Sequence, residues 1–124
     1  MRIAYLHGLE GKHTGKKVDW LNSNYNETYI PSLNYRDSGL FNKTLHDIKQ
    51  FNPDYIIGSS MGGYFSYIIG NTLKIPTILF NPALHSRSFD PDVNISSQKG
   101  THHNIIFGIN DDVIDSSLTK EYLN

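Results

Sequence analysis

The chain has 124 residues, of which 38% are hydrophobic and 19% charged, with a formal net charge of −1 and no cysteine. This composition predicts one globular domain and excludes disulfides, thiolate metal sites and a cysteine nucleophile, while the lack of a basic face argues against a nucleic-acid partner. The first residues have the pattern of a strand rather than a signal region, and no apolar run has membrane length, so we expect a cytoplasmic protein without membrane contact.

Short apolar runs alternate with helical patterns along the chain, which is typical of βαβ units around a parallel sheet. Pro31 interrupts the second strand and predicts an edge position, because proline cannot donate to a ladder. Thr14 and Ser38 are expected to cap the first two helices. We predict a single α/β domain over 1–124, a three-layer sandwich with a mostly parallel sheet. In chain order, its elements are a strand at 3–6, a helix at 14–21, a strand at 28–33, a helix at 40–51, a strand at 55–58, a helix at 61–73, strands at 77–81 and 104–108, and a helix from about 116.

The segment Gly58-Ser59-Ser60-Met61-Gly62 joins a predicted apolar strand to a predicted buried helix. In this context the Gly-X-Ser-X-Gly pattern indicates a nucleophile elbow, a sharp turn that presents its serine at the carboxyl edge of the sheet. Glycines are expected at both ends of the motif because side chains there would collide across the turn. The pattern therefore predicts Ser60 as the nucleophile and the Met61 N–H, at the start of the helix, as an oxyanion donor.

Two further segments at the carboxyl ends of strands complete the predicted site. The loop 7–10 follows the first strand, and the N–H of Leu9 is the expected second oxyanion donor. His7 is expected to hold this loop rather than to act in catalysis. Asp111 follows the last predicted strand and is the natural acid for orienting a histidine, with a purely structural acidic turn as the alternative.

These motifs together resemble the YqiA-like small bacterial esterases of the α/β-hydrolase superfamily over nearly the whole chain. The resemblance implies a shortened α/β-hydrolase fold and a serine esterase or thioesterase that acts on a small ester through an acyl-serine intermediate, without a cofactor or metal. It also implies Ser60 as nucleophile, Asp111 as acid, and Leu9 and Met61 as oxyanion donors. The matching segments are Tyr5-Leu6-His7-Gly8, Gly58-Ser59-Ser60-Met61-Gly62-Gly63-Tyr64, Asn81-Pro82-Ala83 and Asp111-Asp112-Val113-Ile114-Asp115.

The general base has no counterpart at its expected place, because such esterases present a histidine after the acid and no histidine follows Asp111 here. One reading is that the chain lacks the usual C-terminal strand and histidine loop. A second is that another histidine substitutes, with His85 favoured because it follows a strand's carboxyl end, and His13 next. A third is a catalytically degenerate, hydrolase-fold binding protein. His102 and His103 precede the last predicted strand and should lie at the opposite edge. A missing strand would leave an open sheet edge, which makes a homodimer a hypothesis.

A different class of site is suggested by the segment Gly11-Lys12-His13-Thr14-Gly15-Lys16-Lys17, which superficially resembles a phosphate-binding loop. Its glycines are one residue too close, and Lys17 replaces the serine or threonine that would hold magnesium. We therefore expect a lysine-bearing entrance to the first helix rather than a nucleotide site.

Overall fold

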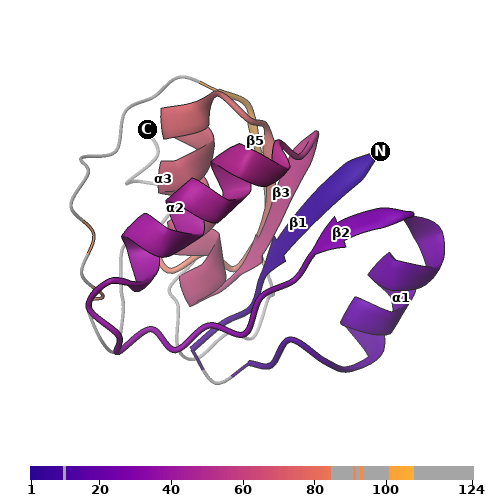
Figure 1. Cartoon of the computed structure of the whole chain (residues 1–124), viewed down its shortest axis with the longest axis horizontal. Helices are drawn as coiled ribbons and strands as arrows, with labels where there is room; N and C mark the ends of the chain where they lie inside the picture. Colours follow the sequence, from indigo (N-terminus) through magenta and orange to yellow (C-terminus); the bar gives the residue numbers. More distant parts are fainter. Residues whose placement is uncertain (10, 85–90, 92, 94–100, 108–124) are drawn as a thin grey trace.

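A parallel sheet lies at the centre of the computed structural model, which describes residues 1–9, 11–84, 91, 93 and 101–107 (Figure 1). All four pairings between the described strands are parallel, and the strand order is β2-β1-β3-β4-β5. The predicted mostly parallel sheet is therefore confirmed. In chain order, the described elements are β1 (Arg2–Leu6), α1 (Lys16–Asn24), β2 (Glu27–Tyr29), α2 (Leu40–Phe51), β3 (Tyr55–Ser59), α3 (Met61–Leu73), β4 (Thr77–Phe80) and β5 (His103–Ile106).

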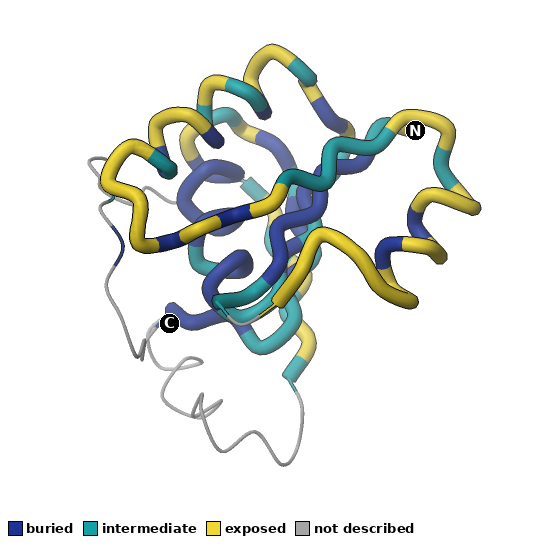
Figure 2. Tube along the Cα trace, turned by 60° about the horizontal axis from the view of Figure 1, so that its bottom comes forward, coloured by how far each residue is buried: buried dark blue, intermediate teal, exposed yellow. Residues whose placement is uncertain are grey.

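Helices cover both faces of the sheet, as Figure 1 shows, which makes the predicted three layers. The pleat of a strand sends successive side chains to opposite faces. On β1, Ile3 and Tyr5 pack with Val18 and Leu21 of α1. Ala4 and Leu6 point the other way, into the larger core formed with α2 and α3. Burial is most continuous along β1 and α3, drawn mainly in dark blue in Figure 2, so two elements next to Ser60 are among the most enclosed of the described chain.

The ends of several elements differ from the prediction. Strand β2 does occupy an edge of the described sheet, but it ends at Tyr29, before Pro31. Helices α1 and α2 are preceded by Gly15 and Gly39, and neither has a side-chain cap hydrogen bond. The predicted caps at Thr14 and Ser38 are therefore wrong by one position. Helix α2 has the predicted range, whereas α1 begins two residues later than predicted.

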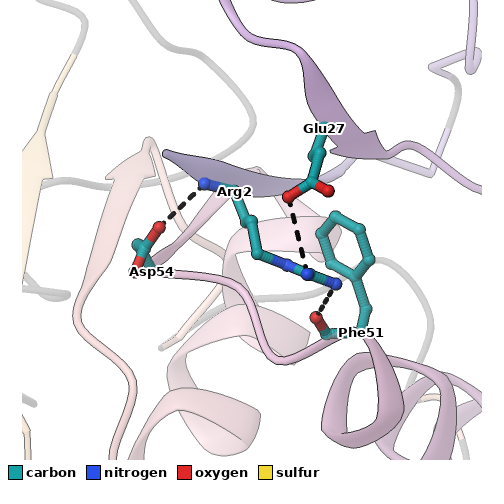
Figure 3. Close-up of polar contacts among 4 residues, drawn as sticks. All are labelled: Arg2, Glu27, Phe51 and Asp54. Atoms are coloured by element: carbon teal, nitrogen blue, oxygen red, sulfur yellow. Dashed lines mark hydrogen bonds and ion pairs between the residues drawn. The ribbon is translucent and has the colours of Figure 1, made fainter.

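Arg2 links the amino ends of the strands to the end of α2 (Figure 3). Its backbone N–H donates to Asp54 Oδ2 at 2.8 Å, and the Asp54 N–H returns a hydrogen bond of 2.8 Å to the Arg2 carbonyl. The guanidinium donates to the Phe51 carbonyl, lies over the Phe51 ring with Cζ 4.5 Å from the centroid, and places Nη1 3.5 Å from Glu27 Oε2. These contacts hold β1, β2 and the α2–β3 connection together at the edge opposite Ser60.

Candidate functional site at the carboxyl edge of the sheet

Ser60 lies at a sharp turn between β3 and α3, with φ 51° and ψ −112°. A positive φ in a residue other than glycine costs on the order of 1–3 kcal/mol, so surrounding contacts must hold it. The Ser60 N–H donates to the Phe80 carbonyl at 3.0 Å, and the Ser60 carbonyl accepts from the N–H groups of Tyr64 at 3.1 Å and Ala83 at 2.9 Å. Hydrogen bonds on both sides of the residue therefore fix the turn that carries its hydroxyl.

The two motif glycines allow close backbone contacts around this turn. A Cβ on Gly58 would overlap the Gly62 carbonyl and Ser66 Oγ, and a Cβ on Gly62 would overlap the carbonyl oxygens of Leu6 and His7. The first turn of α3 thus packs directly on the carboxyl end of β1. Only glycine permits this approach, which brings Ser60 beside the loop that follows β1.

That loop contacts Ser60 through Gly8. A Cβ built on Gly8 would lie 3.3 Å from Ser60 Cβ and 3.9 Å from Ser60 Oγ. The Gly11 N–H donates to the Gly8 carbonyl at 3.0 Å and closes a four-residue turn in which Leu9 is a central residue. The predicted donor loop is therefore adjacent to the serine.

His7 has a structural role in this loop, as expected from the sequence. Its Nε2 accepts the Leu33 N–H at 2.9 Å, so the ring hydrogen lies on Nδ1, which donates to the Gly8 carbonyl at 2.7 Å. The His7 carbonyl accepts the Tyr35 hydroxyl at 2.5 Å, and only 3% of the residue is exposed. Because both ring nitrogens are engaged within the scaffold, His7 is not available to take a proton from Ser60.

Of the two predicted oxyanion donors, Met61 follows Ser60 in the chain, and Leu9 follows Gly8, the residue that contacts Ser60. Within α3 the first backbone hydrogen bond runs from Tyr64 N–H to the Ser60 carbonyl, so the Met61 N–H has no partner in the helix. In the described part of the chain, no group accepts a hydrogen bond from the N–H of Leu9 or of Met61. The oxyanion-donor role predicted for Leu9 and Met61 is compatible with this part of the structure and stays a prediction.

The predicted acid and the favoured base fall in parts of the chain that the structure does not describe. Asp111 and His85 lie outside the described residues. His13 is exposed in the loop between β1 and α1, and His46 is exposed on α2.

Neither a metal site nor a membrane span is found among residues 1–9, 11–84, 91, 93 and 101–107. No group of three or more histidine, aspartate or glutamate side chains there could hold a metal ion. No helix in this part of the chain has the length and the apolar character that a membrane span requires.

His103 lies at the opposite edge of the sheet, as expected from the sequence, where it pairs in register with Thr77. Its Nδ1 is 2.6 Å from Thr77 Oγ1, its Nε2 is 2.7 Å from Asn71 Oδ1, and its ring centroid is 4.5 Å from that of Tyr67. Burial, assisted by the nearby His102, lowers the pKa of His103 to about 4. This polar network joins β4, β5 and α3 away from the candidate site.

The pKa of His103 predicts acid-sensitive stability. The unfolded chain has the ordinary histidine pKa of about 6.5, so between pH 6.5 and about 4 the unfolded state binds more protons than the folded state. The free energy of unfolding should therefore fall as the pH drops through this window. In urea denaturation at pH 7 and pH 5, His103→Gln should flatten this dependence, whereas His46→Gln, at an exposed position, should retain the wild-type slope. An unchanged slope in His103→Gln would contradict the assignment.

Lys17 is a site neighbour that sequence reasoning missed, because it was interpreted only as part of a helix entrance. Its Nζ lies 4.9 Å from the Phe80 ring centroid and 5.7 Å from that of Tyr5. Burial raises the pKa of Tyr5, against a smaller lowering by its hydrogen bond to Ser59. No local pattern signals these contacts, which join α1 to the ends of β1 and β4.

Comparisons with known proteins bear on the family and the fold of the chain. The model of an uncharacterised protein family, UPF0227, matches residues 2–123. Among solved structures, the chain is similar to a candidate hydrolase of the alpha/beta superfamily from Xanthomonas campestris pv. campestris, with a TM-score of 0.75 and 14% identity over 98% of this chain and 77% of the other. No curated protein sequence matches the chain. At this identity the structural likeness bears on the fold, and it confirms the predicted α/β-hydrolase fold.

Proposed function

Because the chain belongs to the uncharacterised protein family UPF0227 and has an α/β-hydrolase fold, we propose that it is a serine hydrolase that cleaves a small ester or thioester. The observation that carries this proposal is the backbone of Ser60, a non-glycine residue at φ 51° between β3 and α3. Such strain is concentrated at functional sites, where it aims a reactive side chain. A turn that had only to connect a strand to a helix would not need it.

The proposed reaction uses groups of the chain alone. Ser60 Oγ attacks the carbonyl carbon while a base takes its proton, and the carbonyl oxygen becomes an oxyanion that the N–H groups of Leu9 and Met61 stabilise. The carbon–oxygen or carbon–sulfur bond then breaks, and the leaving alcohol or thiol takes the proton from the base. Water attacks the acyl-Ser60 ester in the second half of the reaction, which releases the carboxylic acid and restores the serine.

Asp111 and His85 are the proposed acid and base. Asp111 would orient the base and stabilise its protonated form, as the carboxylate of a triad does. His85 follows β4, whose neighbour in the sheet carries Ser60, and a segment leaving that strand starts at the correct edge. His13, exposed in the loop after β1, is the second candidate for the base.

A hydrolase-fold binding protein without turnover is the alternative function. The observation in its favour concerns the described histidines: both ring nitrogens of His7 are engaged, and His103 lies at the opposite edge of the sheet. Without a base, the serine hydroxyl would not be activated, and the N–H groups of Leu9 and Met61 would bind an anionic or carbonyl oxygen without reaction.

Labelling with a fluorophosphonate probe separates these two functions. The folded wild-type protein should form a covalent adduct on the peptide that contains Ser60, and neither Ser60→Ala nor heat-denatured protein should be labelled. Labelling should slow greatly in His85→Ala if that residue is the base, or in His13→Ala if the second candidate serves. A folded wild-type protein that never labels would exclude the activated nucleophile and favour the binding function.

A further inference from the structure

Lys17 is held across the carboxyl end of the strand that leads to Ser60. Its Nζ lies over the ring of Phe80 on β4 and near the ring of Tyr5 on β1, and β3 runs between these two strands. Phe80 pairs in register with Ser59, and its carbonyl accepts the Ser60 N–H at 3.0 Å. The ammonium group therefore lies on the α1 face of the sheet, close to the turn that carries the serine.

The segment that leads to Lys17 is a basic, exposed rim of the same site. It starts at Gly11, which is hydrogen-bonded to Gly8, the residue in contact with Ser60. Residues 11–17 contain Lys12, His13, Lys16 and Lys17 and no acidic residue. All seven residues are exposed, and Figures 1 and 2 show this loop running from the end of β1 to the start of α1.

The positive charge of this rim is not neutralised within the described residues. The ion pairs among the described residues join Arg2 to Glu27 and Lys43 to Asp47, and neither pair involves a residue of the rim. No described carboxylate lies within ion-pair distance of Lys17. The aromatic rings attract the ammonium through their faces and take up none of its three N–H groups in conventional hydrogen bonds. Lys17 is thus positioned by packing, and no acceptor among the described residues takes up its three N–H groups.

We propose that Lys17 and the 11–17 loop bind an oxyanionic group of the substrate, a carboxylate or a phosphate, close to the scissile ester. The inference rests on the proposed function for the cleavage at Ser60, and it adds the substrate class. A lysine ammonium is a compact charge that both oxyanions accept, and the neighbouring Lys12 and Lys16 add a field that attracts anions. The preferred substrate is therefore an ester that carries a negative charge beside the scissile bond, and esters with a charged leaving group test this preference.

Three matched esters test the preference: para-acetoxybenzoate, para-acetoxyphenyl phosphate and the neutral methyl para-acetoxybenzoate. The wild-type protein should have a kcat/KM about tenfold higher for at least one anionic ester than for the neutral ester, the factor expected for one charge-assisted hydrogen bond. Whichever anionic ester has the higher kcat/KM relative to the neutral ester shows whether the site prefers a carboxylate or a phosphate. Because the rim is exposed, added salt should screen its positive charge and reduce the kcat/KM ratio of anionic to neutral ester. This measurement tests the role of the charge without a substitution.

Lys17→Met removes the charge and retains an apolar stem against Phe80 and Tyr5. It should lose about tenfold in kcat/KM on the preferred anionic ester and change little on the neutral ester. Lys17→Arg should keep the preference. Lys49→Met, an exposed change of the same charge at the last turn of α2, is the matched control and should behave as wild type. Equal rates on all three esters, or an equal loss on all three in Lys17→Met, would overturn the proposal.

Binding to the Ser60→Ala protein separates this proposal from the proposed function. Calorimetry should show about tenfold tighter binding of the preferred anionic ester than of the methyl ester, with the difference lost in Ser60→Ala/Lys17→Met. Selective binding by a protein whose wild type hydrolyses none of the esters would support the anion site and overturn the hydrolase. Hydrolysis without any selectivity in rate or binding would support the hydrolase and overturn the anion site.

Discussion

Replacing Ser60 with alanine should reduce ester hydrolysis to the background rate while leaving the fold intact. The hydroxyl oxygen forms the covalent bond in the proposed reaction, and removal of the nucleophile from a serine protease costs about a millionfold in turnover. Alanine retains Cβ, so the strained backbone at φ 51° and its hydrogen bonds to Phe80, Tyr64 and Ala83 are unchanged. Steady-state hydrolysis of para-nitrophenyl acetate measures the loss, and circular dichroism checks the fold.

Ser59→Ala is the matched control for this loss. Ser59 precedes the nucleophile by one residue, and its hydroxyl bonds to Tyr5, so the same atom is removed next to the site. This variant should keep most of the wild-type activity. Equal activities in Ser60→Ala and wild type would exclude the acyl-serine mechanism, and an equally severe loss in Ser59→Ala would show that the effect of Ser60→Ala is not specific to the nucleophile.

Gly62→Ala should lower the free energy of unfolding far more than Gly39→Ala, although both substitutions add one methyl group. The new Cβ would overlap the carbonyl oxygens of Leu6 and His7, which belong to the interior strand β1 and the loop after it. Both are backbone atoms, and Leu6 is paired within the sheet, so they cannot turn aside as a flexible side chain would. Overpacking a core typically costs about 1–3 kcal/mol, and we expect the upper end of that range or more in the free energy of unfolding.

Chemical denaturation measures this loss, with Gly39→Ala as the control. Nothing lies within 4 Å of a Cβ added to Gly39, whose φ of −93° is ordinary for any residue. Its midpoint should therefore remain close to that of wild type. If Gly62→Ala were as stable as Gly39→Ala, α3 could not pack against β1 as closely as described, and the position of Ser60 beside Gly8 would be wrong.

The helices and strands could be predicted from the sequence, because each depends mainly on the residues within its own segment. The alternation of apolar runs with helical patterns identified every described strand and helix, since the period of a segment depends on its own residues. The cap residues were less accurate: Gly15 and Gly39 precede α1 and α2, where Thr14 and Ser38 had been predicted as caps. A side chain able to cap a helix does not determine where the helix starts when packing favours the next residue.

The sequence by itself determined the parallel α/β architecture and the turn at Ser60, because strand, glycines and helix are contiguous there and sterics leave that segment few alternatives. Only the tertiary structure showed that Leu33 and Gly8 occupy both nitrogens of His7, and that Lys17 lies over Phe80 at the end of β4. These contacts join segments far apart in the chain. They depend on the order of strands in the sheet and on which face each helix covers, and no local pattern of residues specifies either.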